Sequence, residues 1–311
     1  MDEVLGSDQA VALAHVTPAS GVVLTPFTNF GLRDREAGTL SALNSSVGLW
    51  RKLDRIRAQP RVAVAYNTRE HGFSDRPEYV LVQGTATLSR PHRRYIDSAP
   101  ELREAFERFA GGNPRGGPVW QRWLAGWHHR VGIDIEVERV VVWPDLACSG
   151  PPEVHGTPLP AEPPAAQSPP AKGTGPRIDT GRAARRAARL PHVLLGWTGA
   201  DGFPVVLPVA IGAAEAGGIV LEAPGDLLPP GGRRAGLTAH WFARHVVGQR
   251  QRIHTGWMEA DPGTGRVLYA PHTQRGYRLP PSKLAYKLGA GFVARRGLRE
   301  ARRRGLTVSK D

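Results

Sequence analysis

The sequence predicts a mainly β protein with some helices, an α+β chain in which two similar units follow one another. Three observations lead to this prediction. The chain has 311 residues, about twice the length of a typical domain. Residues 150–176 contain nine prolines and almost no large apolar side chains, a composition typical of a linker. The same order of predicted elements, with a basic pair in its middle, occurs on both sides of that segment.

The first unit covers residues 1–149. Apolar residues that alternate with polar ones, bounded by turn residues, predict its strands, and apolar residues three or four positions apart predict its helices. Strands are expected at 22–26, 38–44, 62–66, 79–88 and 131–137, with a continuation at 140–143. Helices are expected at 53–57, 100–110 and 119–128.

The second unit covers residues 177–311, and residues 150–176 link the two. Its strands are expected at 204–208, 218–222, 252–259 and 267–270, and helices at 237–247 and 282–288. Leu24 and Arg51 are 27 residues apart, and so are Leu207 and Arg234. We therefore interpret the two units as diverged copies of one plan, each with a basic pair before a helix.

The composition narrows the class of protein. A formal net charge of +13 attracts anions of any kind, nucleotides and nucleic acids included, without selecting among them. Cys148 is the only cysteine, which excludes an internal disulfide and a cysteine-type zinc site. The acidic N-terminal stretch lacks the features of a signal peptide, and prolines and glycines interrupt the longest apolar stretch, residues 203–221. We expect a cytoplasmic protein with no membrane span.

The segment that starts at Asn44 carries the clearest chemistry. Ser45 and Ser46 follow it, and the adjacent cations Arg51 and Lys52 stand at the start of a predicted helix. Hydroxyl and amide donors beside two cations suit a phosphate monoester, and a helix can present its N-terminus to the same anion. A solvated helix start is the alternative for this basic pair.

This order of residues resembles the pyridoxamine 5′-phosphate oxidase-like family of flavin-binding split barrels. Ser45 and Ser46 stand where that family has a Tyr-Thr-like pair, and Lys52 keeps the family's spacing of eight residues to Pro60, which opens a Pro-Arg-Val strand. Residues 79–86 resemble the family's strand ending in a glycine. The resemblance covers roughly the first 145 residues.

The sequence also departs from that family. Val47 replaces an Asn after the hydroxyl pair, Trp50 replaces a Ser before the basic pair, and the arginine-containing C-terminal signature of the true oxidase has no counterpart. A split barrel is therefore predicted more firmly than oxidation of pyridoxamine phosphate.

The resemblance implies two tandem split β-barrels that form an intramolecular pseudo-dimer, so that the protein works as a monomer. It implies an oxidoreductase that binds FMN or the deazaflavin F420 between the barrels, or a flavin carrier descended from one, with haem as a third possible cofactor. The cofactor-binding residues it implies are Asn44, Ser45, Ser46, Trp50, Arg51 and Lys52. Trp50 is expected either to line the pocket of the flavin ring or to pack in the protein interior. The catalytic residues and the substrate, a small molecule, are not predicted.

The alternative function is a noncatalytic basic protein that binds nucleic acid. The arginine-rich run 294–305 would contact phosphates, although a solvated helix or tail is the favoured interpretation of it. Arg233 and Arg234 follow two glycines, which leaves open a second oxyanion cradle or a plain surface. The histidines lack a metal-ligand spacing, so no metal site is predicted, and His272 is expected only at a pocket wall.

Overall fold

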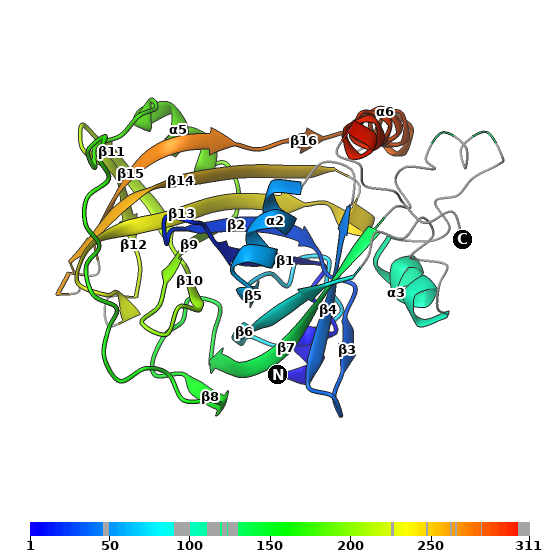
Figure 1. Cartoon of the computed structure of the whole chain (residues 1–311), viewed down its shortest axis with the longest axis horizontal. Coiled ribbons are helices and arrows are strands. Elements are labelled where there is room, and N and C mark those ends of the chain that lie inside the picture. Colours follow the sequence, from blue (N-terminus) through cyan, green and yellow to red (C-terminus); the bar gives the residue numbers. More distant parts are fainter. Residues whose placement is uncertain are drawn as a thin grey trace.

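The computed structural model describes residues 1–45, 50–89, 100–110, 119, 123, 130–224, 227–246, 248–261, 263–264, 266–280 and 282–303. Two eight-stranded antiparallel sheets with few helices make up this part of the chain (Figure 1). They are two tandem split β-barrels, which confirms the predicted fold class. The helix expected at 119–128 lies outside the described residues except for positions 119 and 123.

The first sheet has the strand order β2-β1-β5-β6-β7-β4-β3, and β8 pairs with β7. Its strands are β1 (Ala10–Val16), β2 (Val22–Thr28), β3 (Leu32–Asp34), β4 (Thr39–Ser45), β5 (Arg61–Tyr66), β6 (Tyr79–Leu88), β7 (Arg130–Trp143) and β8 (Glu153–Gly156). The helices of this half are α1 (Asp2–Leu5), α2 (Trp50–Ala58) and α3 (Pro100–Ala110). The strands predicted for this half are all present.

The second sheet repeats this order as β10-β9-β13-β14-β15-β12-β11, with β16 paired to β14. Its strands are β9 (His192–Thr198), β10 (Pro204–Pro208), β11 (Ala210–Glu215), β12 (Gly218–Glu222), β13 (Gly231–Phe242), β14 (Gln249–Asp261), β15 (Arg266–Arg275) and β16 (Arg278–Leu279). The helices are α5 (Thr180–Ala187), η4 (Arg244–Val246) and α6 (Lys283–Arg303). The helix predicted at 282–288 is therefore the start of α6.

Both sheets carry a bulge at the same place. The register between β6 and β7 shifts between Gln83 and Gly84, and the register between β14 and β15 shifts between Thr255 and Gly256. A Cβ atom on either glycine would overlap a backbone oxygen of the neighbouring strand, so only glycine fits there. This shared irregularity supports the interpretation of the halves as diverged copies.

The helix predicted at 237–247 is wrong, because β13 runs through to Phe242 and η4 follows it. Residues 235–240 are all buried, since β13 pairs on one side with β9 and on the other with β14. A strand buried on both faces loses the alternation that distinguishes strand from helix. Arg234 therefore lies in a strand and Arg51 in a helix, so their equal intervals do not mark equivalent positions.

The proline-rich segment is tied to both halves. Its strand β8 extends the first sheet, whereas Gln167 donates its backbone N–H to the Gly232 carbonyl at 2.9 Å and accepts a bond from the Arg234 N–H at 3.0 Å. Arg233 donates to the Pro164 carbonyl at 3.1 Å. The segment therefore follows the edge of the second barrel instead of hanging free between the halves.

The two barrels share a core at the seam between them. One continuous cluster of buried side chains contains Leu24 from the first half and Leu195 and Leu237 from the second. Buried hydrogen bonds cross the seam in both directions: Tyr79 donates to the Val206 carbonyl at 2.6 Å, and Gln251 donates to the Pro26 carbonyl at 2.8 Å. The halves thus form an intramolecular pseudo-dimer.

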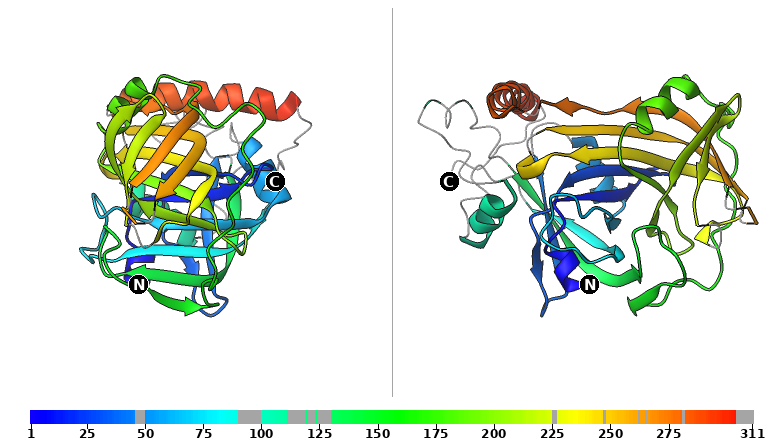
Figure 2. Two further views of the ribbon diagram at one scale, coloured as in Figure 1. Left: turned by 90° about the vertical axis from the view of Figure 1, so that its left-hand side faces the viewer. Right: turned by 180° about the vertical axis from the view of Figure 1, so that it is seen from behind.

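The barrels lie side by side along the long axis of the molecule, with α5 at one end and α3 and α6 at the other (Figure 2). None of the helices that the structure describes combines the length and the apolar character needed to cross a lipid bilayer.

Candidate functional site

Helix α2 places the predicted basic pair beside the first sheet. Trp50, Leu53 and Ile56 recur every three residues and are buried, so this face of the helix packs on the sheet, mainly on β1 and β6. Arg51 is exposed on the first turn, whereas Lys52 points inward and is buried. The amphipathic pattern of α2 therefore directs one cation of the pair into the protein.

Lys52 is the unusual member of this pair. Its side chain is nearly as buried as the core residues around it, and burial lowers the pKa of its ammonium from 10.5 to about 8. Burial is the whole cause of the shift, so no carboxylate of the described residues compensates for it. A buried ammonium without a counterion is a strong attractor for an anion.

The neighbours of Lys52 are also basic. His15 of β1 is almost completely buried, and burial followed by the charges of Lys52 and Arg55 lowers the pKa of its ring to about 3. Burial and the charges of Arg51 and Arg275 lower the pKa of Arg55 in turn. We call Arg51, Lys52, Arg55 and Arg275 the cationic cluster. Because Arg275 belongs to β15, both halves of the chain contribute to it.

The other predicted site residues are placed as follows. Asn44 lies near the end of β4 and is buried, and Ser45 is the last residue of that strand. Ser46 and the side chain of Ser45 lie outside the described residues. Trp50 packs in the core of the first half, which is one of the two roles expected for it. Contact of any of these residues with a cofactor stays a prediction.

The second basic pair has a structural role. Arg233 is almost completely buried and donates to the carbonyls of Pro164 and Pro230 at 3.1 and 2.7 Å. Arg234 bonds to Gln167 and lies over the Trp257 ring, with its guanidinium carbon 5.9 Å from the ring centre. The glycines before this pair begin β13, and their backbone receives the proline-rich segment. This pair therefore holds the segment against the second barrel.

The histidines occupy several different environments. The structure shows no group of three metal-ligating side chains among the residues it describes. The His272 ring lies 3.2 Å from the Thr174 carbonyl, so it contacts the proline-rich segment. His71 and His245, in contrast, face one cavity.

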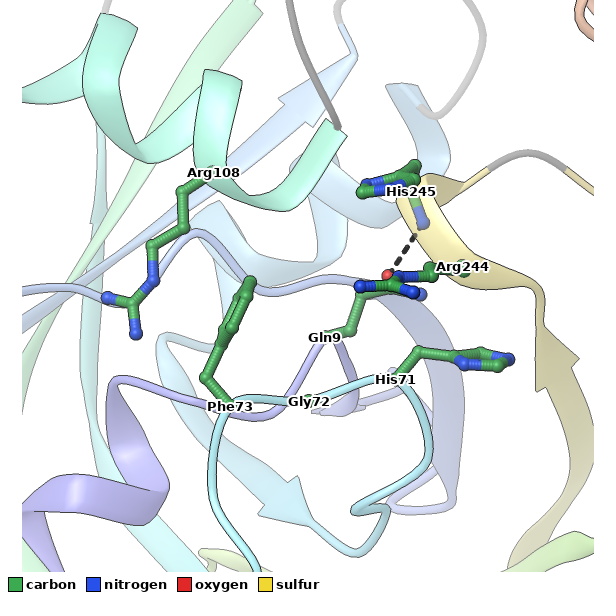
Figure 3. Close-up of a pocket in the computed structure, with 7 residues that line it drawn as sticks. All are labelled: Gln9, His71, Gly72, Phe73, Arg108, Arg244 and His245. Carbon is green, nitrogen blue, oxygen red and sulfur yellow. Dashed lines mark hydrogen bonds between the residues drawn. The ribbon is translucent and has the colours of Figure 1, made fainter.

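That cavity lies at the seam and was not predicted from the sequence. It has a volume of about 290 Å³ and is lined from both halves of the chain (Figure 3). Its lining residues are Gln9, His71, Gly72, Phe73, Arg108, Arg244 and His245. They come from positions up to 236 residues apart, so no local sequence pattern predicts that they meet.

Comparison with known proteins gives only distant likenesses. No protein-family model and no curated protein matches the chain. Solved structures match over about half of it. A conserved hypothetical protein from Mycobacterium tuberculosis is 19% identical, with 50% of this chain and 89% of that one covered and a TM-score of 0.32.

Two further solved structures have informative names. A pyridoxamine 5′-phosphate oxidase-related, FMN-binding protein from Nostoc punctiforme is 16% identical, with 47% and 78% of the two chains covered and a TM-score of 0.29. A structure named F420 reductase is 16% identical, with 45% and 94% covered and a TM-score of 0.32. Likeness at this level does not determine what the present chain binds, so the functional argument rests on its own residues.

Proposed function

We propose that the cationic cluster binds the phosphate of FMN or of the deazaflavin F420, and that the protein is an oxidoreductase of the pyridoxamine 5′-phosphate oxidase-like class. The observation that carries the proposal is the buried ammonium of Lys52, which has no carboxylate partner among the described residues. A phosphate would supply the missing counterion.

The residues present fit a phosphate group. Lys52 provides a point charge, and the planar guanidinium of Arg51 can bind two phosphate oxygens at once. Both stand in the first turn of α2, where the free backbone N–H groups and the helix dipole favour an anion. Arg275 adds charge from the other barrel. Asn44, Ser45 and Ser46 complete the proposed set as hydrogen-bond donors.

The cofactor, when bound, supplies the hydride or electron transfer. The role of the protein is to neutralise the phosphate, to fix the position of the flavin ring at the seam and to exclude water. We further propose that residues 1–149 and 177–311 act as the two barrels of one monomer, joined by residues 150–176, and that the first barrel carries the working site. In the second barrel, the described part of the connection between β12 and β13 contains no α-helix like α2.

Nucleic-acid binding is the second candidate, favoured by one observation. The exposed arginines of α6 form a basic surface at one end of the molecule. They include Arg295, Arg296, Arg299 and Arg303. Such a surface binds nucleic-acid phosphates without sequence preference and with steep salt dependence.

The absorption spectrum of the purified protein separates the candidates. A flavin or deazaflavin band, or saturable binding of added FMN or F420, supports the proposal, and a Soret band indicates haem instead. A colourless protein that binds neither flavin, but binds DNA with an affinity that falls steeply with salt, contradicts it.

The binding site is tested by replacing Arg51 and Lys52 together with alanine. We expect the affinity for the phosphorylated flavin to fall at least about tenfold, since two charge-assisted contacts are lost. The matched control is Arg57→Ala on the same helix, where the exposed Arg57 pairs with Asp54 at 3.4 Å. Unchanged affinity in the double variant would remove these residues from the site.

A further inference from the structure

The seam cavity defined above is separate from the cationic cluster. Gln9, which lines it, precedes the first residue of β1, whereas His15, which faces Lys52, is near the end of that strand. Six residues of extended chain, at ~3.3 Å per residue, place the two about 20 Å apart. The cavity volume of about 290 Å³ is also at the lower end of the range of small-molecule pockets. It suits a ligand much smaller than a flavin.

The lining of the seam cavity is basic. Two guanidiniums and two imidazoles contribute to it, and none of the seven lining residues is acidic. Within the described part of the chain, neither Arg108 nor Arg244 forms an ion pair. The two guanidiniums come from α3 and η4, so one element of each half brings positive charge to this place, whereas His71 of the loop after β5 lies 3.5 Å from Glu70.

One wall of the seam cavity is aromatic. The Phe73 ring is about half exposed, and the Arg108 guanidinium lies over it at 4.3 Å. Phe109 packs edge-on against the same ring, with the ring centres 5.1 Å apart. Figure 3 shows Phe73 and Arg108 on one side of the cavity and Arg244 and His245 on the other. A flat apolar body therefore has an aromatic surface to stack on, next to the Arg108 guanidinium.

Two residues that line the cavity have a backbone conformation that non-glycine residues rarely adopt. Four non-glycine residues of the described chain have positive φ, and two of them, His71 at 61° and His245 at 58°, line this cavity. Such backbone strain concentrates at functional sites, where surrounding contacts maintain it. At His245 the buried Gln9 maintains it, because the Gln9 amide accepts from the His245 N–H and donates to the Ala243 carbonyl, both at 2.9 Å.

We propose that the seam cavity is a second ligand site, which binds a small aromatic anion such as an aryl phosphate. The anionic group is held between Arg108 and Arg244, and the ring stacks on Phe73. Because the two arginines belong to different halves, the ligand also joins the two barrels. The proposal does not depend on flavin binding at the cationic cluster.

Calorimetric titration of the full chain with phenyl phosphate tests the site. We expect saturable binding, weaker binding of inorganic phosphate because it lacks the ring, and no binding of benzyl alcohol because it lacks the charge. Phenyl phosphate should also raise the melting temperature, since it binds the folded chain only. Absence of phenyl phosphate binding, or equal binding of inorganic phosphate, would overturn the proposal.

Four variants locate the binding. Arg108→Met and Arg244→Met should each weaken phenyl phosphate binding at least about tenfold, and Arg244→Lys, which keeps the charge, should weaken it less. The control Arg189→Met removes an exposed arginine that does not line the cavity and should leave the affinity unchanged. An equal loss in the control would show nonspecific attraction to a basic protein and refute the site.

A fifth variant, Lys52→Met, distinguishes this site from the cationic cluster. It should abolish the preference for phosphorylated flavin and leave phenyl phosphate binding intact. If Lys52→Met instead removes phenyl phosphate binding while Arg244→Met does not, the anion binds at the cluster and the seam cavity is not its site.

Discussion

Replacement of Lys52 by methionine should make the free protein more stable at neutral pH. Methionine keeps the length and apolar character of the side chain but removes the buried charge. The pKa of Lys52 falls from 10.5 to about 8 on folding, and at about 1.36 kcal/mol per unit this difference corresponds to ~3 kcal/mol. The wild-type chain bears that cost wherever the ammonium is charged in both states.

The sign of the pH dependence follows from the lowered pKa. Between pH 8 and 10.5 the unfolded chain holds more protons than the folded one, so the stability of the wild type rises with pH in this window. Below pH 8 both states are protonated and the full cost applies. The stability advantage of Lys52→Met should therefore be up to ~3 kcal/mol at pH 7 and should vanish as the pH rises through about 10.5.

Urea unfolding of wild type and variant at a series of pH values from 7 to above 10 measures this difference. Arg57→Met on the exposed side of α2 serves as the control and should change the stability by less than about 0.5 kcal/mol. A Lys52→Met protein that is less stable than the wild type at pH 7, or a difference that does not depend on pH, would refute the idea of an uncompensated buried ammonium.

Two further perturbations test the architecture. Gly84→Ala and Gly256→Ala should each lower the free energy of unfolding in urea by about 3 kcal/mol, because the added methyl group overlaps a backbone oxygen at the bulge. The control Gly175→Ala, where no atom lies within 4 Å of the added methyl group, should be neutral. A neutral effect at both bulges would contradict their equivalence. Arg139→Met should lower the free energy of unfolding by about 3 kcal/mol, since the buried Arg139 contacts Asp201 of the other half. A loss below about 1 kcal/mol would show that this contact does not hold the two barrels together.

The strands β2, β4, β5, β6 and β7 of the first barrel could be predicted because they have a sequence signature, whereas β1, β3 and β8 were not predicted. Turn residues bound them, and Pro60 opens β5 directly after the amphipathic helix α2. The strand β13 could not be predicted, since pairing on both sides buries its two faces and removes the alternation on which the prediction depends. Whether this segment forms a strand or a helix is decided by its pairing with β9 and β14, and β9 is distant from it in the sequence.

The candidate site shows the same division. Arg51 and Lys52 were predicted from adjacent residues and their spacing to Pro60, but the burial of Lys52 depends on its packing against β1 and could not be read from the sequence. The seam cavity depends on Gln9 meeting His245, 236 positions later. Such a contact exists only once both barrels have formed and joined.

The most direct test of the account compares FMN with riboflavin, which has the same ring and no phosphate, in titrations with wild type and Lys52→Met. If F420 is the bound cofactor, its dephosphorylated form takes the place of riboflavin. The account predicts that the wild type binds the phosphorylated form at least about tenfold more tightly, a difference of about 1.4 kcal/mol, and that Lys52→Met removes this preference. Equal affinities for both forms in the wild type, or a preference that survives the loss of Lys52, would contradict it.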